Sequence, residues 1–204
     1  LLGSLILLQI ELFINLSSMA DKKIYQFKLS LRDYKPPIWR RIQVPADYSF
    51  RDLHVAIADA MGWKDYHLHY FKLRNGITIG PSDPDSDDLD EKVEKIAKTF
   101  SEEGAKFRYE YDMGDGWEHD VVLEKILDSD GGKYPRCVAG KRACPPEDCG
   151  GIFGFGELLE KLADKNDPEH DESTNWLEEC GYHNYDPAHF VPSDVVFDDP
   201  AVRQ

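Results

Sequence analysis

Three short segments of the chain carry most of the side chains that could do chemistry, and the first is His67-Leu68-His69. These residues fall in a run with the alternation of a β-strand, where side chains at positions i and i+2 point to the same face. Both imidazoles could therefore chelate one metal ion. The alternative is structural, with one imidazole at the sheet edge and the other packed beside Phe71. The sequence leaves open whether the two imidazoles bind a metal ion or take these structural positions.

The second segment, residues 112–119 (DMGDGWEH), has the composition of a hairpin tip. Gly-Asp-Gly is what a tight turn with positive φ favours, and this alone explains the two glycines. The turn would also bring four side chains together beside Trp117, namely Asp112, Asp115, Glu118 and His119. Together they could bind a divalent cation or exchange protons. The spacing does not match a calcium loop. We expect a tight turn, with metal or acid–base chemistry as the alternative.

The third segment, residues 137–151 (CVAGKRACPPEDCGG), holds three of the four cysteines. Cys137, Cys144 and Cys149 could bind zinc with a fourth ligand from outside the segment, such as His119, Cys180 or His183. Their spacing lacks the two-residue gap of zinc knuckles. Pro-Pro, Glu-Asp and Gly-Gly instead favour a rigid loop, in which Glu147 or Asp148 accepts hydrogen bonds from backbone N–H groups. No cofactor is predicted, and zinc at these thiols is the alternative.

Charge and cysteine content limit the class of protein. The 204-residue chain has a formal net charge of −15, which disfavours nucleic acid as the main partner, because duplex binding requires Lys and Arg against phosphates. Its charge is uneven: residues 19–54 carry eight basic and four acidic side chains, and residues 155–204 carry three basic and thirteen acidic ones. Four cysteines in a chain of this length favour reduced thiols over a disulfide scaffold, so we expect a cytoplasmic protein.

Residues 1–18 are largely apolar but differ from a signal peptide or a membrane anchor. The segment has no basic region, Glu11 interrupts it, and it is shorter than the ~20 residues that cross a bilayer. By contrast, residues 19–23 (MADKK) resemble a natural start and lead directly into a strand. The segment is therefore expected to be a non-native or disordered leader, with the native protein starting at Met19.

The remaining elements predict a single α+β domain over residues 19–204, ending in an acidic tail. Strands are expected at residues 24–31, 38–44, 67–74, 77–80, 106–112 and 117–127, and helices after Ser49, at 89–100, 157–165 and 172–180. Asn75-Gly76 favours a type I′ hairpin. Residues 128–153 are expected to be irregular. About five to six strands built from hairpins indicate a mainly antiparallel sheet covered by helices.

Six blocks of the sequence resemble the plasmid pRiA4b ORF-3-like family. They are residues 37–42 (PIWRRI), 53–54 (LH), 62–63 (GW), 67–69 (HLH), 109–119 (YEYDMGDGWEH) and 143–151 (ACPPEDCGG). The resemblance implies a single α+β domain from a microbial family without an assigned biochemical function. Its members are often labelled mobile-element passengers or resolvase-like. No serine nucleophile with phosphate-binding arginines can be identified in this chain to support that label.

The leading interpretation is a non-enzymatic binding or accessory domain, because no nucleophile–base pair, phosphate loop or cofactor fingerprint is recognisable. A small-molecule ligand or protein partner would bind near the Gly-Asp-Gly-Trp hairpin and the Cys-Pro-Pro-Glu-Asp-Cys loop. The candidate binding residues are Trp39, Arg40, Arg41, His67, His69, Asp112, Asp115, Trp117, His119, Glu147 and Asp148.

Two other function classes stay open. The first is a metal-dependent hydrolase, in which His67, His69, Asp112, Asp115 and His119 hold the ion and Glu147 or Asp148 acts as a base on water. The second is a nucleic-acid accessory protein acting through Lys35, Arg40 and Arg41, which the acidic charge disfavours.

Overall fold

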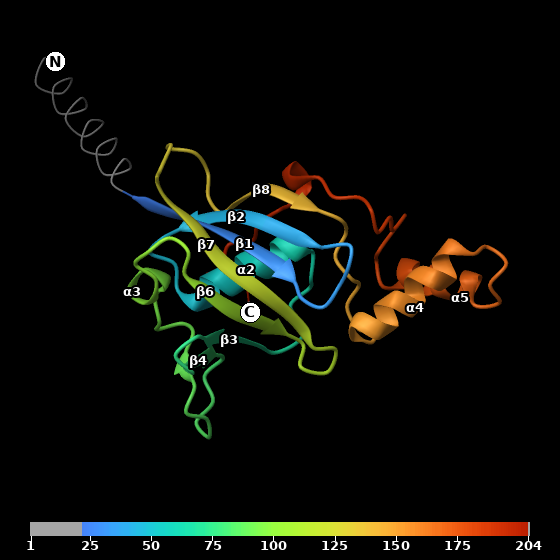
Figure 1. Ribbon diagram of the computed structural model, residues 1–204, viewed down its shortest axis with the longest axis horizontal. Helices are drawn as coiled ribbons and strands as arrows, with labels where there is room; N and C mark the ends of the chain where they lie inside the picture. The colour runs from blue at the N-terminus through green and yellow to red at the C-terminus, as the bar shows by residue number, and fades with distance from the viewer. Residues whose placement is uncertain (1–21, 204) are drawn as a thin grey trace, which may run out of the picture.

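One eight-stranded sheet organises residues 22–203, the part of the chain that the computed structural model describes (Figure 1). The predicted leader, residues 1–18, and the expected start at Met19 lie outside the described residues. The strand order is β5-β4-β3-β6-β7-β1-β2-β8, and every pair is antiparallel except β4–β5. The strands are β1 (Lys23–Leu31), β2 (Trp39–Pro45), β3 (His69–Leu73), β4 (Thr78–Gly80), β5 (Leu89–Asp90), β6 (Lys106–Tyr111), β7 (Trp117–Asp128) and β8 (Arg136–Lys141).

Alternation along the strands divides the sheet into a buried and a polar face. Tyr25, Phe27, Leu29 and Leu31 of β1 all belong to the core, as the period-2 pattern predicts. On the opposite face, Gln43 donates to Gln26 and Arg41 binds the Glu124 carboxylate through two nitrogens. An antiparallel sheet of this kind needs a helix on one side only. Figure 1 shows α2 (Phe50–Met61) running behind the sheet, where it closes the core.

Helix α2 begins and ends as the sequence predicts. Ser49 accepts a hydrogen bond from the backbone N–H of Asp52 at 3.1 Å, and the Asp52 carboxylate accepts one from the Ser49 N–H at 2.8 Å. This is a capping box, which satisfies two N–H groups that the helix itself leaves free. Gly62 ends the helix in the left-handed region, at φ 90°.

Replacement of the cap, Ser49→Ala, should lower the free energy of unfolding by about 1 kcal/mol, because one N–H of the first turn loses its acceptor. Urea denaturation followed by circular dichroism measures the change. Ser101→Ala, at an exposed loop position, is the matched control and should leave the midpoint unchanged. Equal midpoints for both variants would contradict the role of the cap.

The prediction of five to six strands was wrong, because β5 and β8 were missed. Strand β8 lies in the segment that was expected to be irregular, and its residues are half-buried or exposed without alternation. It is an edge strand, so little of it reaches the core. Strand β5 has only two residues and pairs in parallel with β4. The helix expected at residues 89–100 is reduced to α3 (Ile96–Thr99), since its first residues form β5 and the following turn.

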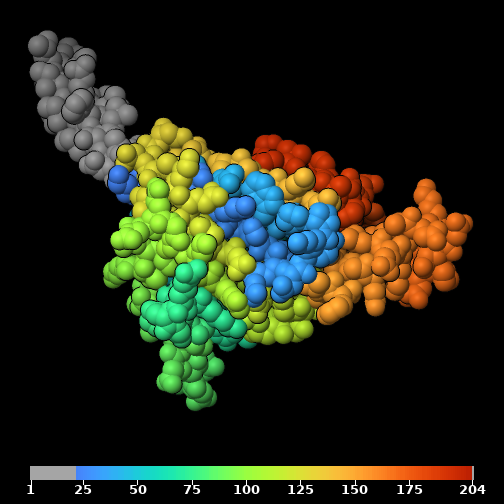
Figure 2. All heavy atoms as spheres, viewed as in Figure 1, coloured from blue at the N-terminus to red at the C-terminus, as the bar shows by residue number. Residues whose placement is uncertain are grey.

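The chain after β8 forms a projecting lobe and then returns to the sheet. Helices α4 (Gly151–Ala163) and α5 (His170–Glu179) form the orange lobe in Figure 2. The acidic C-terminal segment, with the short helix η1 (Pro192–Asp194), then packs along β8 and α2. The Phe190 ring covers Gly140, where a Cβ atom would lie 2.2 Å from it, and Arg203 binds Asp59 at 2.5 Å. Within residues 22–203, no helix has the length and apolar character that crossing a bilayer requires.

Candidate functional site

The strongest group of potential metal ligands joins three segments that are distant in sequence. His67 lies in the bend before β3, Asp112 directly follows β6, and Asp148 belongs to the Cys-Pro-Pro-Glu-Asp-Cys loop before α4. The His67 Nε2 atom lies 3.2 Å from Asp148 Oδ1 and 3.7 Å from Asp112 Oδ2. One nitrogen and two carboxylate oxygens therefore converge, all within 4.8 Å of one another.

The backbone around this group is specialised to place the two carboxylates. Asp112 and Asp148 both adopt left-handed conformations, with φ of 53° and 59°. Aspartate tolerates this region better than most residues, and such positions gather where the surrounding structure enforces them. Asp112 Oδ1 accepts the backbone N–H of Gly114 at 3.0 Å, which fixes the hairpin turn. Oδ2 is the Asp112 oxygen that faces His67.

Glu147 holds the Cys-Pro-Pro-Glu-Asp-Cys loop against the rest of the domain. Its Oε1 accepts hydrogen bonds from the Tyr111 hydroxyl at 2.5 Å and from the Lys64 backbone N–H at 3.0 Å. Its own backbone N–H donates to the Tyr182 hydroxyl at 2.9 Å. Burial and the neighbouring Glu147 raise the pKa of Tyr111, so this phenol remains a proton donor. Glu147 therefore positions its neighbour Asp148.

The hairpin tip and the start of α4 make a second connection at the site. The Gly150 N–H donates to Asp115 Oδ2 at 3.1 Å, which places a carboxylate at the positive end of the helix. At Gly151, φ is +68°, and a Cβ atom would lie 2.4 Å from the Asp115 carbonyl oxygen. Only glycine allows this approach. Asp115 therefore caps a helix and does not join the group at His67.

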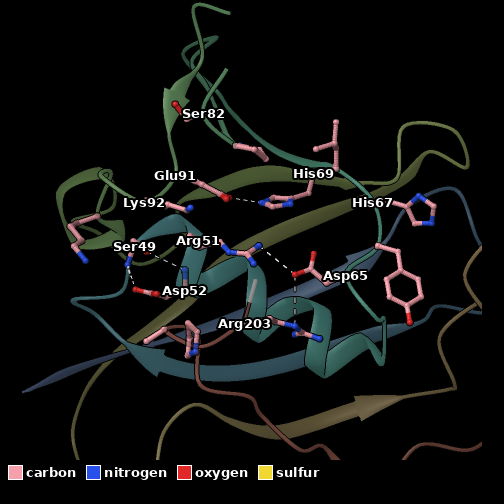
Figure 3. A pocket seen from close by; sticks show the side chains of 16 residues that line it. Ser49, Arg51, Asp52, Asp65, His67, His69, Ser82, Glu91, Lys92 and Arg203 are labelled. Carbon is pink, nitrogen blue, oxygen red and sulfur yellow. Dashed lines mark hydrogen bonds and ion pairs between the residues drawn. The ribbon is translucent and has the colours of Figure 1, made fainter. Parts of the chain in front are cut away.

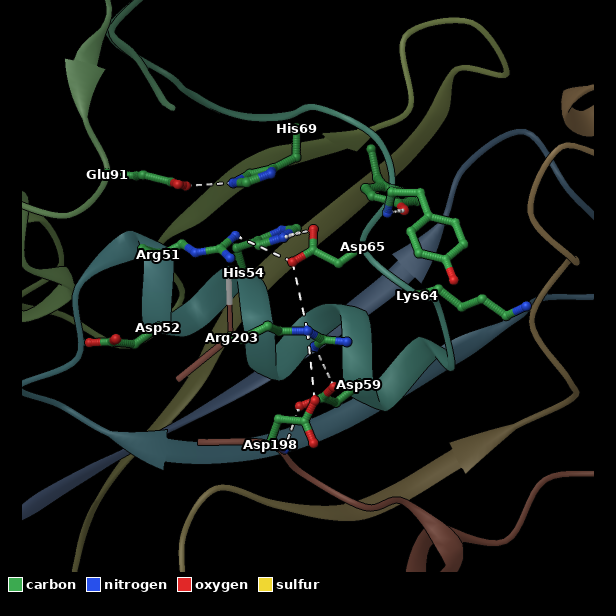
Figure 4. Close-up of polar contacts among 12 residues, drawn as sticks. Arg51, Asp52, His54, Asp59, Lys64, Asp65, His69, Glu91, Asp198 and Arg203 are labelled. Atoms are coloured by element: carbon green, nitrogen blue, oxygen red, sulfur yellow. Dashed lines mark hydrogen bonds and ion pairs between the residues drawn. The ribbon is translucent and has the colours of Figure 1, made fainter. Parts of the chain in front are cut away.

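A second group of titratable residues lies in the core beside α2 (Figure 4). His54 and His69 stack with ring centroids 3.3 Å apart and an interplanar angle of 3°. His54 Nε2 lies 2.6 Å from Asp65 Oδ1, His54 Nδ1 lies 2.8 Å from the Tyr109 hydroxyl, and His69 Nε2 lies 2.5 Å from Glu91 Oε2. Burial lowers the pKa of His54 to about 3, so its ring is neutral, with both nitrogens hydrogen-bonded.

His54, Asp65 and His69 also lie close enough together to be considered as metal ligands. Contacts of 2.5 to 2.6 Å between their nitrogens and the carboxylates are hydrogen-bond distances. They are shorter than the separation of about 3.3 Å between two ligands of one tetrahedral ion. We therefore interpret this group as two carboxylate–histidine pairs and assign the metal-like geometry to the group at His67.

The structure separates His67 from His69, which corrects the prediction that the two share one face. Strand β3 begins at His69, so His67 stands in a bend, where the two-residue period of a strand does not apply. His119, by contrast, is fully buried against Trp63, and neither ring nitrogen has a partner among the described residues. Trp117 is also in the core. Neither side chain reaches the group at His67.

The three clustered cysteines do not form a ligand set in the described chain. Neither group of potential ligands within residues 22–203 includes a thiol, and Cys137, Cys144 and Cys149 are all free. Burial raises the pKa of the Cys149 thiol to about 12 and also raises that of Cys144. The arrangement therefore favours the rigid-loop alternative for this segment.

The Trp39-Arg40-Arg41 strand also lies apart from the group at His67. Arg40 is buried and donates to the carbonyl oxygens of Ala60 and Lys141, with its guanidinium 3.6 Å from the centre of the Phe190 ring. Arg41 points to the polar face and binds Glu124. Both arginines therefore have partners within the chain, and neither belongs to the group at His67.

Several residues of the two groups were not found by sequence reasoning. Asp65 and Glu91 lie in irregular segments without a recognisable motif, and they reach the histidines only through the fold. His54 did carry a signal, since it stands among the apolar positions of α2 and is fully buried. A histidine in such a position needs a hydrogen-bond partner, which the structure identifies as Asp65.

Comparisons with known proteins agree with this architecture. A solved structure, a protein of unknown function, MM3350, from Methanosarcina mazei Go1, superimposes with a TM-score of 0.76 and is 43% identical, with 86% of this chain and 99% of that chain covered. An uncharacterised protein, y4hQ, of Sinorhizobium fredii is 34% identical over 185 residues, covering 88% of this chain and 93% of the relative.

The family resemblance noted in six blocks of the sequence is confirmed over almost the whole sheet and lobe. The model of the plasmid pRiA4b ORF-3-like proteins matches residues 23–194, from the first residue of β1 to the last of η1. The chain belongs to the plasmid pRiA4b ORF-3-like protein family.

Proposed function

We propose that this protein is a metal-binding domain that holds a divalent transition-metal ion through His67, Asp112 and Asp148. One imidazole and two carboxylates are ligands that suit zinc and manganese. The site lies between the Gly-Asp-Gly-Trp hairpin and the Cys-Pro-Pro-Glu-Asp-Cys loop. The bound ion would present its remaining coordination positions to a ligand or partner from solution.

The spacing of the three donor atoms carries this proposal. Ligand atoms about 2.0–2.2 Å from a tetrahedral ion lie about 3.3–3.6 Å from one another. The His67 nitrogen lies 3.2 Å and 3.7 Å from the two aspartate oxygens, so an ion would fit with only small side-chain movements. His67 Nε2 is also buried without a hydrogen-bond partner among the described residues. Metal coordination would satisfy this nitrogen.

Burial differs among the three ligands and leaves one side of the site open. The His67 and Asp112 side chains are 27% and 10% exposed, and that of Asp148 is 67% exposed. An ion held here would therefore face solvent on the Asp148 side. A site with three protein ligands and an open position binds exogenous ligands, whereas a closed site with four protein ligands is purely structural.

Titration of zinc into the purified protein, measured by calorimetry, should show one binding site per chain. His67→Ala should abolish binding, and Asp112→Asn should weaken it strongly, because asparagine keeps the turn but removes the carboxylate charge. Saturation at 100 times the Kd should raise the free energy of unfolding by about 2.7 kcal/mol. His183→Ala is the matched control, since that imidazole is 68% exposed and belongs to neither group of potential ligands, and it should bind zinc normally.

Two results would count against the proposal. One is zinc stoichiometry that is the same in His67→Ala and the parent protein. The other is a loss of binding in Cys144→Ser with none in His67→Ala, which would move the site to the thiols. Manganese and magnesium titrations test the choice of metal, because magnesium favours all-oxygen sites and should bind weakly.

A metal-dependent hydrolase is the second candidate, favoured by the open position beside Asp148. A metal-bound water there would be acidified and could attack an ester or phosphoester. Glu147, which precedes Asp148 in the sequence, was considered as the base that acts on this water. Its hydrogen bonds to Tyr111 and Lys64 instead give it a structural role. Zinc-loaded protein that hydrolyses p-nitrophenyl esters, with His67→Ala inactive, would establish the enzyme. Zinc binding without such turnover would leave the binding domain as the function.

A further inference from the structure

A cleft of about 780 Å³ opens between α2, β3 and the β5–α3 segment, and His67 is among the residues that line it. Figure 3 shows it from close by, with Arg51 at its centre, Lys92 from the turn after β5 and Arg203 from the C-terminal segment. A cleft of this size accepts a metabolite-sized ligand. The residues that line it include four cations, namely Arg51, Lys92, Lys95 and Arg203.

The carboxylates of the cleft are each engaged by nearby donors. Asp52 accepts the N–H of Ser49 in the capping box. Asp65 lies 2.6 Å from His54 and 3.4 Å from Arg51, and Glu91 lies 2.5 Å from His69. These contacts fix the carboxylates in the wall but leave their charge in place, so the lining sets four cations against three carboxylates.

The two lysines, by contrast, have no carboxylate within 4.0 Å among residues 22–203. Arg51 uses only Nη1 in its contact with Asp65, so the other donors of its guanidinium remain available. Two lysines without a carboxylate partner and the remaining donors of Arg51 thus line one cleft of a chain whose net charge is −15. Such a cleft attracts anions by its local charge despite the overall repulsion.

We propose that this cleft binds a small polyanion, a molecule with two or more phosphate or carboxylate groups, through Lys92, Lys95 and Arg51. Lys92 and Lys95 are three positions apart on one segment, and Arg51 faces them from the first turn of α2. Arg203 contributes a fourth positive charge from the opposite wall, where Asp59 fixes it at 2.5 Å. This inference goes beyond the metal site, because none of the four cations belongs to the group at His67.

Calorimetric titration with pyrophosphate and, separately, with citrate tests the proposal. Both are run at low ionic strength on protein that has been stripped of metal with EDTA and then dialysed free of it, so that no metal at His67 bridges the ligand and the chelator does not compete for the cleft. The double variant Lys92→Ala/Lys95→Ala should bind about tenfold or more weakly, since two charge-assisted contacts are lost. Lys98→Ala/Lys133→Ala is the control, because it removes the same charge from exposed lysines outside the cleft and should change the Kd less than twofold.

The relative affinities for the two probes identify the class of ligand. Stronger binding of pyrophosphate than of citrate supports a phosphate ligand, and the reverse supports a carboxylate ligand. Absence of saturable binding of both probes to the parent protein overturns the proposal, as does an equal loss in the two double variants. In metal-free protein, His67→Ala should retain polyanion binding although His67 lines the cleft, because the anion is assigned to Lys92, Lys95 and Arg51. Loss of zinc binding alone therefore leaves this proposal standing.

Discussion

Acidification from pH 7.5 to pH 5 should lower the free energy of unfolding by about 2 kcal/mol for each of two buried histidines, His54 and His119. Burial lowers the pKa of His54 to about 3 and that of His119 to about 4, from an ordinary value near 6.5. Both rings are therefore neutral in the folded protein and take up a proton on unfolding. The unfolded chain binds more protons below pH 6.5, so acid favours it. Above pH 6.5 the two neutral rings therefore cost the folded protein no stability. The free energy of unfolding falls as the pH drops from 6.5 towards 4.

The variant His119→Leu isolates one half of this effect. It removes a titratable ring with two nitrogens that lack partners, so the variant should be as stable as the parent at pH 7.5, or more stable. Its stability should depend less on pH by about 2 kcal/mol between pH 7.5 and pH 5. Urea denaturation at several pH values measures both. Parallel pH profiles for His119→Leu and the parent would refute this account of His119.

Gly151→Ala should destabilise the fold by roughly 3 kcal/mol and weaken zinc binding. The alanine would be held at φ +68°, which costs a non-glycine residue roughly 1–2 kcal/mol, and its Cβ would meet the Asp115 carbonyl oxygen at 2.4 Å. The hairpin and the start of α4 would have to separate. Because Asp112 and Asp148 stand on these two segments, separation would also enlarge the proposed metal site.

Gly156→Ala provides the matched comparison, since it lies in the same helix and its Cβ would have no neighbour within 4 Å. Alanine favours the helix at such a position, so this variant should gain about 0.5–1 kcal/mol. Thermal and urea denaturation compare the two variants, and calorimetry compares their zinc affinity. If Gly151→Ala is as stable as Gly156→Ala, then the contact with Asp115 does not hold the two segments together.

Local signals predicted the elements that make their own core contacts. The alternation of β1, the start of α2 after Ser49 and the Gly-Asp-Gly turn between β6 and β7 are properties of adjacent residues, and all three occur as expected. Strands β5 and β8 depend on partners from elsewhere in the chain. A two-residue strand has no period, and an edge strand covered by the C-terminal segment has no buried face, so neither pattern was visible.

The sequence named the members of the group at His67 but did not separate them from His69, Asp115 and His119. His67, Asp112 and Asp148 were all candidates, yet the sequence placed His67 with His69 because it treated both as strand residues. The start of β3 at His69 is set by its pairing with Tyr111, which is a tertiary property. The cations of the cleft come from α2, the β5–α3 segment and the C-terminal segment. No local motif joins these parts, so the cleft could be recognised only in the folded chain.

The segment that packs along β8 also has a consequence for self-association. An open edge strand presents unpaired N–H and C=O groups to which another chain can add. Here the Ala143 N–H, just past the end of β8, donates to the Pro187 carbonyl oxygen, and Phe190 lies over Gly140. At the other edge, β5 is only two residues long. The sheet therefore offers little free edge at either end, and the C-terminal segment protects the protein against edge-to-edge aggregation as well as forming a wall of the cleft.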